Sequence, residues 1–313
     1  MKQITILIPA YNEAESIPLL IEALNSTTRQ LTQYAWEYLF VNDGSSDDTL
    51  QVIRSLREHN PQISYIDLSR NFGKENAMLA GFDYATGDAV IIMDADLQHT
   101  PSVLPLMLEK WEAGFDDVYA QRKTRGKESW LRKRLTMRYY RMLQGSSRMD
   151  VLPNVGDFRL LDRKCIEALR QMRESGRYTK GMYCYIGFRK TAVEFETQDR
   201  VAGQSSMSYR KLVRLAIEGL TSYTTAPLRF ATFIGILVSV LAFGYMIFVF
   251  VKALIYGDPV AGYPTLMTVM LFLGGIQLLT IGIIGEYLGK VFNEVKHRPV
   301  YFVREYNGKE ATK

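Results

Sequence analysis

Two aspartates spaced two positions apart follow an apolar run in the first third of the chain. Asp94 and Asp96 come directly after residues 90–93, and the amide of Gln98 follows two positions later. Residues two apart on an extended backbone point to the same side, so these oxygens can face one point at the end of a buried strand. Hard oxygen ligands in this arrangement suit Mg²⁺ or Mn²⁺ holding a diphosphate. An Asp-rich turn closing a strand is the alternative for such a motif taken alone.

Two more polar segments close apolar runs earlier in the chain. They are residues 9–13, Pro-Ala-Tyr-Asn-Glu, and residues 42–45, Asn-Asp-Gly-Ser. Functional groups of parallel sheets gather beyond the carboxyl ends of the strands, so three such ends predict a carboxylate-lined cleft at one sheet edge. The carboxylates of Glu13 and Asp43 are suited to accept hydrogen bonds from ribose hydroxyls and a base N–H.

The elements that must position these groups alternate between short apolar strands and amphipathic helices. The predicted strands are residues 4–9, 36–41, 64–68 and 89–93, and the predicted helices are residues 16–26, 49–59 and 74–85. This alternation is typical of an α/β sheet covered by helices on both faces. Asp47 or Asp48 can cap the helix 49–59.

The last third of the chain differs sharply in composition. Overall, 23% of the 313 residues are charged, and the mean hydropathy is −0.08. Residues 230–251 and 259–285 contain no charged side chain, and each run exceeds the ~20 residues that cross a bilayer core as a helix. Two membrane-spanning helices are therefore predicted, at about 230–252 and 262–286. Gly257, Asp258 and Pro259 join them as a hairpin.

Charges flanking the two runs predict the orientation of this hairpin. No signal peptide precedes the first strand, so the large N-terminal part is expected in the cytosol. Lysines and arginines lie on both sides of the hairpin, at 210, 211, 214 and 229 before it and at 290, 296, 298 and 304 after it. Positive flanks place both ends on the cytoplasmic side of an inner membrane. The predicted parts are a cytosolic domain over 1–226, the hairpin over 227–290, and a basic cytosolic tail over 291–313.

A basic segment lies in the middle of the cytosolic domain. Residues 122–148 contain ten basic residues and one acid, Glu128. Leu131, Leu135, Tyr139 and Met142 recur there at helical spacing, which predicts an amphipathic helix at about 129–145 on an anionic membrane surface. A solvated helix packed on its own domain is the alternative. A second juxtamembrane helix is predicted at about 208–224. No nucleic-acid partner is expected, and two cysteines are too few for a disulfide framework.

Residues 9–13, 42–45 and 94–98, in this order, resemble family 2 inverting glycosyltransferases with the GT-A fold. The match narrows with residues 70–75 (Arg-Asn-Phe-Gly-Lys-Glu), 156–160 (Gly-Asp-Phe-Arg-Leu) and 285–289 (Gly-Glu-Tyr-Leu-Gly). Together these motifs resemble the polyprenyl-phosphate glycosyltransferases, which include bactoprenol glucosyltransferases and dolichol-phosphate mannose synthases. The bactoprenol branch shares the two-span C-terminus.

The resemblance implies roles for individual residues. Contacts to the nucleotide sugar would come from Pro9, Tyr11, Glu13, Asp43, Asp94 and Ala95. Asp96, with Gln98 and Asp94, would hold the metal and the diphosphate. His99 follows this motif, and a histidine on such a loop is expected to be exposed rather than a ligand.

A second group of residues would handle the phosphates. Arg200 and Ser205 resemble the family's Arg-x-x-Gly-x-Ser phosphate clamp, although Ser206 and Met207 stand where a lysine often follows. The other cations proposed to hold two anions together are Lys74, Arg122 and Arg159. A structural ion pair is the alternative for Arg122 and for Arg159. An aspartate in the region of Asp157 is assigned as the base in the related family. Two alternatives stay open for Asp157: it orients the acceptor, or it pairs with Arg159.

The predicted activity is inverting transfer of one sugar from a UDP-sugar to polyprenyl (undecaprenyl) phosphate at the cytoplasmic membrane face. A phosphate monoester, with a second pKa near ~6, is mostly dianionic at neutral pH and can attack without a base. Glucose is favoured by the resemblance, with N-acetylglucosamine or a GDP-mannose donor as alternatives. Transfer to a lipid hydroxyl would require Asp157 as a base. A nucleotide-sugar binding subunit without turnover is the non-enzyme alternative, and the resemblance implies a homotetramer.

Overall fold

The computed structural model describes residues 1–122, 155–195, 226–256 and 262–310. The chain divides into two compact units. The first comprises Met1–Gln144, Arg148–Ser208 and Arg298–Lys313, and the second comprises Gly145–Ser147 and Tyr209–His297.

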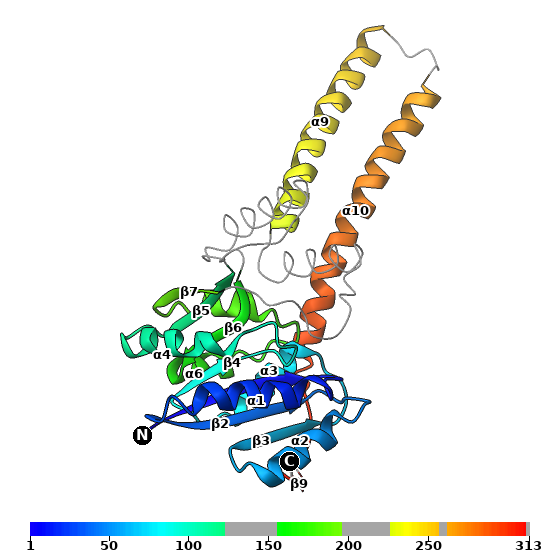
Figure 1. Ribbon diagram of the computed structural model, residues 1–313. Coiled ribbons are helices and arrows are strands. Elements are labelled where there is room, and N and C mark those ends of the chain that lie inside the picture. The colour runs from blue at the N-terminus through cyan, green and yellow to red at the C-terminus, as the bar shows by residue number, and fades with distance from the viewer. Residues whose placement is uncertain (123–154, 196–225, 257–261, 311–313) are drawn as a thin grey trace. The chain divides into compact units, whose positions relative to one another are not determined.

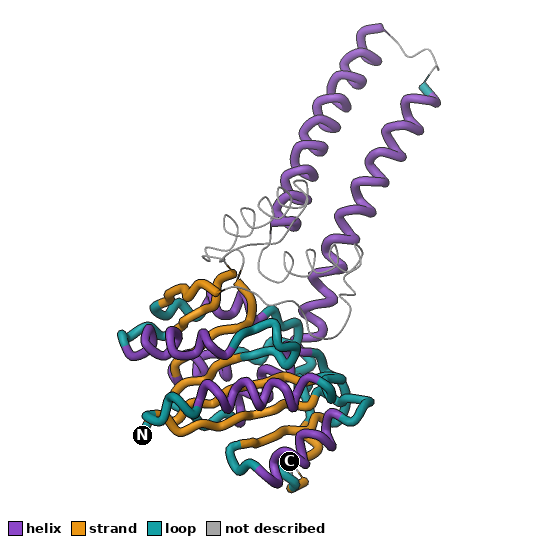
Figure 2. The backbone as a smooth tube through the Cα atoms, in the orientation of Figure 1, coloured by secondary structure: helices purple, strands orange, loops and turns teal. Residues whose placement is uncertain are grey.

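The first unit is built on one nine-stranded sheet, which forms a layer between helices (Figures 1 and 2). The strand order is β7-β5-β6-β4-β1-β2-β3-β8-β9. The strands are β1 (Lys2–Ala10), β2 (Tyr34–Asn42), β3 (Ile63–Leu68), β4 (Ala89–Ile92), β5 (Asp117–Arg122), β6 (Val155–Asp162), β7 (Lys190–Phe195), β8 (Val303–Tyr306) and β9 (Lys309–Glu310). The helices are α1 (Ser16–Thr28), α2 (Thr49–His59), α3 (Lys74–Tyr84), the 3₁₀ turn η1 (Pro101–Val103), α4 (Leu104–Glu112), α6 (Arg163–Gln171) and α7 (Thr179–Tyr185).

The four predicted strands lie next to one another in this sheet and are all parallel, and β5 and β7 form a second parallel pair. β1 lies between β2 and β4 and is parallel to both, and β3 is parallel to β2. Their carboxyl ends therefore lie along one edge, as the sequence predicts. β6 runs antiparallel to β4 and pairs Ile92 with Arg159, so the start of β6 lies beside the end of β4.

Both faces of the sheet are buried, as the near-continuous apolar strands predict. Ile4, Ile6 and Ile8 of β1 pack with α1, α2 and α4 on one face. Leu7 packs with α3, α6 and α7 on the other. Each fully buried side chain of this size contributes about 1.5–3 kcal/mol relative to exposure.

Helix α3 lies unusually close to β1. A Cβ atom placed on Gly81 would lie 2.1 Å from Cδ1 of Leu7, so a larger residue would require the buried Leu7 side chain or the helix itself to shift. This close contact fixes the axis of α3, and with it the position of Lys74 in its first turn. At the start of α2, the N-cap residue Asp48 makes no side-chain capping hydrogen bond, and Oδ1 of the preceding Asp47 accepts the backbone N–H of Thr49 instead (3.1 Å).

The segment that follows the hairpin differs from the predicted basic tail. Residues 303–310 form β8 and β9, and β8 pairs antiparallel with β3. The backbone N–H of Ser69 donates to the carbonyl of Phe302 (2.9 Å). Strands of four and two residues are too short to show a periodic pattern in the sequence, and their partner β3 lies more than 200 positions earlier.

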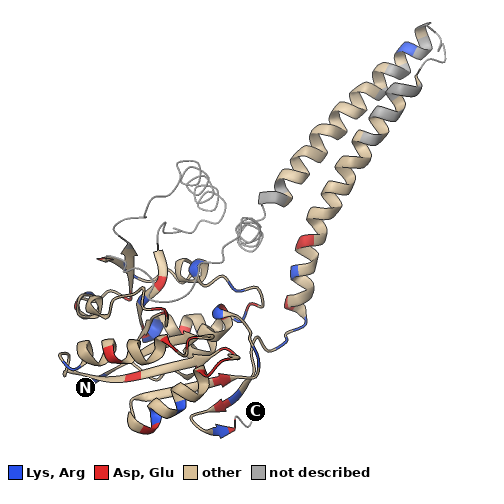
Figure 3. Ribbon diagram, turned by 45° about the vertical axis from the view of Figure 1, so that its right-hand side comes forward, with Lys and Arg blue, Asp and Glu red and all other residues tan. Residues whose placement is uncertain are grey.

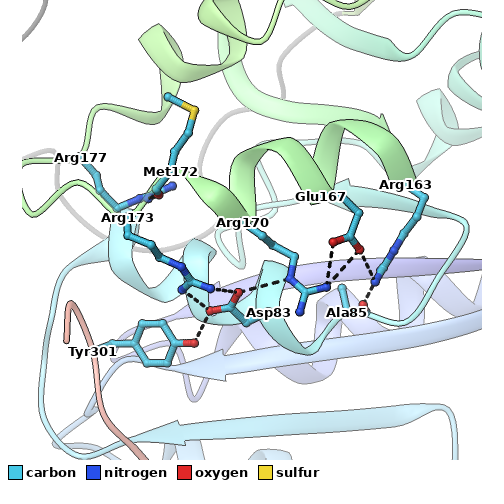
Figure 4. A network of polar contacts seen from close by, with 9 residues as sticks. All are labelled: Asp83, Ala85, Arg163, Glu167, Arg170, Met172, Arg173, Arg177 and Tyr301. Atoms are coloured by element: carbon cyan, nitrogen blue, oxygen red, sulfur yellow. Dashed lines mark hydrogen bonds and ion pairs between the residues drawn. The ribbon is translucent and has the colours of Figure 1, made fainter.

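A polar network fixes this segment to α3 (Figure 4). Asp83 of α3 accepts two hydrogen bonds from the guanidinium of Arg173, at 2.6 and 2.7 Å, and one from the hydroxyl of Tyr301. Arg170 adds an ion pair to the same carboxylate. The chain after the hairpin is thus anchored to the C-terminal end of the helix whose first turn carries Lys74.

The second unit contains two long helices, α9 (Ala226–Tyr256) and α10 (Tyr263–Val295), which lie side by side as a hairpin (Figure 1). Figure 3 shows few charged residues on the two helices, near the far end of α9 and toward the end of α10. Among the described residues, Phe272–Val295 is long and apolar enough to cross a membrane, and Phe230–Tyr245 is a shorter apolar stretch. Large apolar side chains on both helices are exposed, for example Phe243 and Leu278.

Candidate active site

A pocket of about 360 Å³ opens at the carboxyl ends of β1, β2 and β4. Its lining includes most of the residues that the sequence predicts for the nucleotide sugar and metal, together with Lys74: Pro9, Tyr11, Glu13, Asp43, Lys74, Asp94, Ala95 and Asp96. Ala10, Asn71, Gly73 and Ala77 complete it, and the sequence assigns none of these four a role of its own. We call it the donor pocket.

The turn after β1 is held by hydrogen bonds to the turn after β2 and to the first residues of α1 and α2. Asn12 has a left-handed backbone (φ 57°), and its Oδ1 accepts the backbone N–H of Ser46 (2.9 Å). The backbone N–H of Glu13 donates to Oγ1 of Thr49 (2.8 Å), and Oε2 of Glu13 accepts the hydroxyl of Ser16 (2.6 Å). These bonds fix the carboxylate of Glu13 at the edge of the pocket.

Asp43 is buried and holds the opposite wall. Its two oxygens accept the backbone N–H groups of Phe72 (2.7 Å) and Gly73 (2.9 Å). Burial raises the pKa of Asp43, and these two hydrogen bonds partly offset that rise. The sequence predicts Asp43 as a nucleotide contact. In the structure its carboxylate also holds the loop that joins β3 to α3 by these two hydrogen bonds.

The same loop passes directly over Gly44. A Cβ atom on Gly44 would lie 2.4 Å from the carbonyl carbon of Arg70 and 2.5 Å from the nitrogen of Asn71, and the residue has φ +65°. Gly73 has φ +91°, a conformation that residues with a side chain rarely adopt. The wall of the pocket therefore depends on two glycines, one for space and one for backbone conformation.

Asp94, Asp96 and His99 converge in the turn after β4. Each can offer one ligand atom, and the three atoms lie within 4.8 Å of one another. Leu97 has a left-handed backbone (φ 59°), and Oδ1 of Asp96 accepts the backbone N–H of Gln98 (3.1 Å). Two carboxylates and an imidazole form a donor set that fits a hard divalent cation such as Mn²⁺ or Mg²⁺.

His99 is the residue in this turn for which the sequence-based expectation is wrong. The side chain is buried rather than exposed, with 5% of its surface accessible. Its ring stacks on Phe158 (centroids 4.7 Å apart, interplanar angle 23°) and meets the edge of Phe195. These aromatic partners come from β6 and β7, so no local sequence pattern could reveal the burial.

Lys74 contacts two carboxylates, one in the turn after β4 and one in β6. Its Nζ lies 2.6 Å from Oδ1 of Asp94 and 2.9 Å from Oδ2 of Asp157. The pairing of Ile92 with Arg159 explains this, because Asp94 follows Ile92 by two residues and Asp157 precedes Arg159 by two. One ammonium group thus bridges a carboxylate of the donor pocket and a carboxylate of β6.

The bridge keeps Lys74 and Asp157 charged. Burial by itself lowers the pKa of Lys74, but the negative charges of Asp94 and Asp157 outweigh it and raise the pKa above its ordinary value. Burial raises the pKa of Asp157, but the charge of Lys74, with smaller contributions from Lys180 and Arg159, lowers it overall. A carboxylate held ionised in this way is poorly matched to proton abstraction near neutral pH.

Arg159 lies outside this bridge. The structure places its guanidinium 3.0 Å from Asp117 and 3.7 Å from the ring centroid of Tyr183, and both charged side chains are almost fully buried. The sequence predicts Arg159 as a phosphate or acceptor contact or as a partner of Asp157, with a structural ion pair as the alternative. The structure instead gives it Asp117, from the neighbouring strand β5, as its ion-pair partner.

The remaining predicted residues are described in part or not at all. Arg122 is the last residue of β5. Arg200, Ser205 and the predicted helices 129–145 and 208–224 lie outside the described residues. Sequence reasoning missed Glu75, which accepts hydrogen bonds from the backbone and hydroxyl of Thr179 and so ties the first turn of α3 to α7. Its place beside Lys74 in the motif 70–75 was the available signal.

Comparisons with known proteins identify relatives of both parts of the chain. The family described as "Glycosyl transferase family 2" matches residues 5–170, and "GtrB C-terminal hairpin" matches residues 226–291. An uncharacterized glycosyltransferase of Synechocystis is 41% identical over 308 residues, covering 98% of this chain and 96% of its own. A bactoprenol glucosyl transferase of Shigella phage SfV is 40% identical over 302 residues, covering 96% and 98%.

Among solved structures, glucosyl-3-phosphoglycerate synthase from Mycobacterium tuberculosis, in complex with phosphoglyceric acid, superposes with a TM-score of 0.50. The match has 18% sequence identity and covers 71% of this chain and 80% of that one. At this identity the likeness shows the fold alone, a GT-A-like α/β domain. The match to the hairpin family shows membrane association through α9 and α10.

Proposed function

This chain belongs to glycosyl transferase family 2, and from that premise we propose that it transfers glucose from UDP-glucose to a polyprenyl phosphate, with inversion at the anomeric carbon. The observation that carries the proposal is the Lys74 bridge, which joins the donor pocket to Asp157. The bactoprenol glucosyl transferase relatives, matched along nearly the whole chain, support the choice of sugar and acceptor.

The donor pocket would take the nucleotide sugar. Glu13 is fixed by Ser16 and Thr49 where it can accept hydrogen bonds from the uridine, and Tyr11 lies exposed at the rim. Asp94, Asp96 and His99 would hold the divalent ion, with Gln98 as a further predicted ligand. When bound, this ion supplies Lewis-acid stabilisation to the departing diphosphate.

The acceptor side needs no proton transfer if the acceptor is a phosphate. An oxygen of the phosphate dianion forms a bond to the anomeric carbon, while the bond from that carbon to the β-phosphate oxygen breaks and its electron pair leaves with UDP. The nucleophile is already ionised above its second pKa near ~6. Asp157, held ionised by Lys74, then acts by fixing Lys74 and by its field, in agreement with its lowered pKa.

Lys74 is well placed to bring two anions together. Its ammonium is held between two carboxylates, so it stays protonated and has a defined position when substrates arrive. A fixed cation between the donor diphosphate and the acceptor phosphate would reduce their mutual repulsion. The clamp predicted at Arg200 and Ser205 would contribute on the acceptor side.

Labelled substrates provide the test. The full-length chain in membranes is incubated with Mn²⁺, polyprenyl phosphate and labelled UDP-glucose, UDP-N-acetylglucosamine or GDP-mannose, and the lipids are then separated. The expected result is label in a lipid product from UDP-glucose, and little in the matched Asp96→Asn membranes. Lipid labelling from another donor alone would replace glucose in the proposal, and no labelled lipid from any donor would refute it.

A further inference from the structure

A second pocket, of about 520 Å³, lies beside the donor pocket within the first unit. One side is the loop after β3, with Arg70 and Phe72. The other side is the segment after the hairpin, with Arg298, Pro299, Val300 and Phe302. Nothing in the predicted sugar transfer uses it.

The lining combines cations with apolar surface. Two arginines contribute the charge, and no carboxylate is found among the described residues that line the pocket. The guanidinium of Arg70 lies over the ring of Phe72, 4.2 Å from its centroid, and Phe72 packs near Phe302 with centroids 6.3 Å apart. A planar guanidinium matches the oxygens of a phosphate, and the rings suit the carbon chain attached to one.

The second pocket includes residues that follow the hairpin directly in the sequence, which indicates that its ligand would come from the membrane. The candidate membrane span of α10, Phe272–Val295, carries Glu286, Lys290 and Glu294 in its C-terminal part, and Leu288, Phe292 and Val295 remain exposed alongside them, as expected where a helix leaves a bilayer through the headgroup region. Arg298 follows Val295 by three residues, a span of at most about 11 Å even when fully extended. A pocket lined by Arg298 therefore stays within reach of the membrane interface, where basic residues attract anionic lipids.

We propose that this second pocket binds the phosphate headgroup of an anionic membrane phospholipid, through Arg70 and Arg298, with the start of its acyl chains against Phe72 and Phe302. Its lining residues differ from those of the donor pocket. It is a lipid-binding site of the enzyme rather than a site of sugar transfer.

The two pockets share the loop of residues 70–73 as a wall, so a lipid bound in the second pocket would also affect the donor pocket. Along the loop, Arg70 and Phe72 line the second pocket, whereas Asn71 and Gly73 line the donor pocket. Asp43 clamps this loop through the N–H groups of Phe72 and Gly73. A lipid that restrains Arg70 and Phe72 therefore also restrains the donor wall, and we expect tighter nucleotide binding when the lipid is present. This coupling rests on the proposed function.

Lipid retention tests the site without using transferase activity. The full-length chain, purified in a mild detergent, is mixed with equal amounts of phosphatidylglycerol and phosphatidylcholine, and bound lipid is counted by native mass spectrometry. The wild type should retain phosphatidylglycerol preferentially, and Arg298→Gln and Arg70→Gln should each reduce that preference by about fivefold or more. Arg29→Gln removes an exposed charge at the end of α1, away from both pockets, and should behave like the wild type.

Three results would overturn the site. These are equal retention of the two lipids by the wild type, unchanged retention in both pocket variants, and full displacement of the lipid by millimolar inorganic phosphate. The last would show that the pocket takes a free anion. Thermal unfolding of each variant checks folding, which exposed positions such as Arg298 should leave intact.

A second measurement tests the coupling. UDP affinity with Mn²⁺ is measured in nanodiscs of pure phosphatidylcholine and in nanodiscs containing phosphatidylglycerol. The wild type should bind UDP about fivefold more tightly with the anionic lipid, and Arg298→Gln should show no such difference. Equal affinities in the wild type would refute the coupling. If UDP does not bind at all, the proposed function fails, while lipid retention still decides the lipid site.

Discussion

Nζ of Lys74 lies 2.9 Å from Oδ2 of Asp157, a residue 83 positions further along the chain. The same nitrogen contacts Asp94, so the lysine links the predicted metal and nucleotide side of the site to the predicted acceptor side. Its position follows from the fold. Gly81 lets α3 pack tightly on β1, and the antiparallel pairing of β6 with β4 brings Asp157 next to Asp94.

Removing this cation should disable transfer more than it weakens nucleotide binding. Lys74→Met leaves Asp94 and Asp157 close together without compensation, so one of them is expected to take up a proton near neutral pH. We expect kcat to fall by about a hundredfold or more, by analogy with the loss of other fixed electrostatic groups. Lys74→Arg, which keeps the charge, should retain more activity. Initial rates and UDP calorimetry on both variants measure this, and wild-type kcat in Lys74→Met would contradict the role.

The dependence of the rate on pH should reflect the acceptor rather than the enzyme. The pKa of Asp157 is lowered, so the carboxylate and the stability it contributes are present at neutral pH and lost only in acid, below its ordinary value near ~3.9. The pKa of Lys74 is raised, so its contribution is present below its ordinary value near ~10.4 and lost only at higher pH. Neither group should titrate between about pH 5 and 9, the range in which the acceptor phosphate, near ~6, changes charge.

We therefore predict a rate that rises through about pH 6 and then stays level, measured with a soluble short-chain prenyl phosphate. Asp157→Asn should keep the same profile with a partial loss of rate. An inflection in the wild type that disappears in Asp157→Asn would instead identify Asp157 as a titrating base.

The acidic turn can be tested by metal binding itself. Asp96→Asn and His99→Ala should each weaken Mn²⁺ binding, measured by electron paramagnetic resonance in the presence of UDP, by about tenfold or more. His59→Ala is a suitable control because His59 is exposed at the end of α2, far from this turn in the sequence. Unchanged Mn²⁺ affinity in His99→Ala would remove this histidine from the ligand set and leave Gln98 as the predicted partner of the aspartates.

Substitution of Gly44 should disturb the loop that forms one wall of the donor pocket. Gly44→Ala should displace the loop at Arg70 and Asn71, because the added Cβ meets backbone atoms that cannot rotate away. We expect a loss of about 1–3 kcal/mol in the free energy of unfolding and a weaker affinity for UDP. Gly176→Ala is the matched control, since a Cβ there has no neighbour within 4 Å. Calorimetry and thermal unfolding give both quantities, and a Gly44→Ala protein equal to the control would show that the loop adapts.

The buried pair of Arg159 and Asp117 should matter for stability. Arg159→Met leaves Asp117 fully buried without its partner, and burial already raises the pKa of that carboxyl. Removing one member of a buried pair costs about 3–5 kcal/mol, whereas Arg159→Met combined with Asp117→Leu should recover much of the loss. Denaturant unfolding of the first unit tests this. A stable Arg159→Met protein with a raised KM for the acceptor would instead restore Arg159 as a substrate contact.

The sequence predicts the groups that lie at strand ends and misses those that depend on distant contacts. Each of Glu13, Asp43, Asp94 and Asp96 follows an apolar run in the sequence. Because the carboxyl ends of parallel strands lie together, the convergence of these side chains can be predicted from the local sequence and this one topological rule. The burial of His99 depends on Phe158 and Phe195, which lie on strands whose pairing no local pattern specifies.

The same limit explains the other differences. The choice of Asp117 over Asp157 as the partner of Arg159 depends on the register of β5 against β6. The addition of β8 to the edge of the sheet depends on contacts across more than 200 residues. The hairpin, by contrast, can be predicted from the sequence, because two uncharged runs long enough to cross a membrane are visible in its composition alone.

The most direct test of the account compares two acceptors that differ only in the attacking group. Initial rates are measured with UDP-glucose, Mn²⁺ and either a prenyl phosphate or the prenyl alcohol of the same chain length, for the wild type and Asp157→Asn. The account predicts transfer to the phosphate only, retained in part by Asp157→Asn, because the phosphate needs no base. Transfer to the alcohol, or complete loss of phosphate transfer in a folded, UDP-binding Asp157→Asn protein, would contradict it.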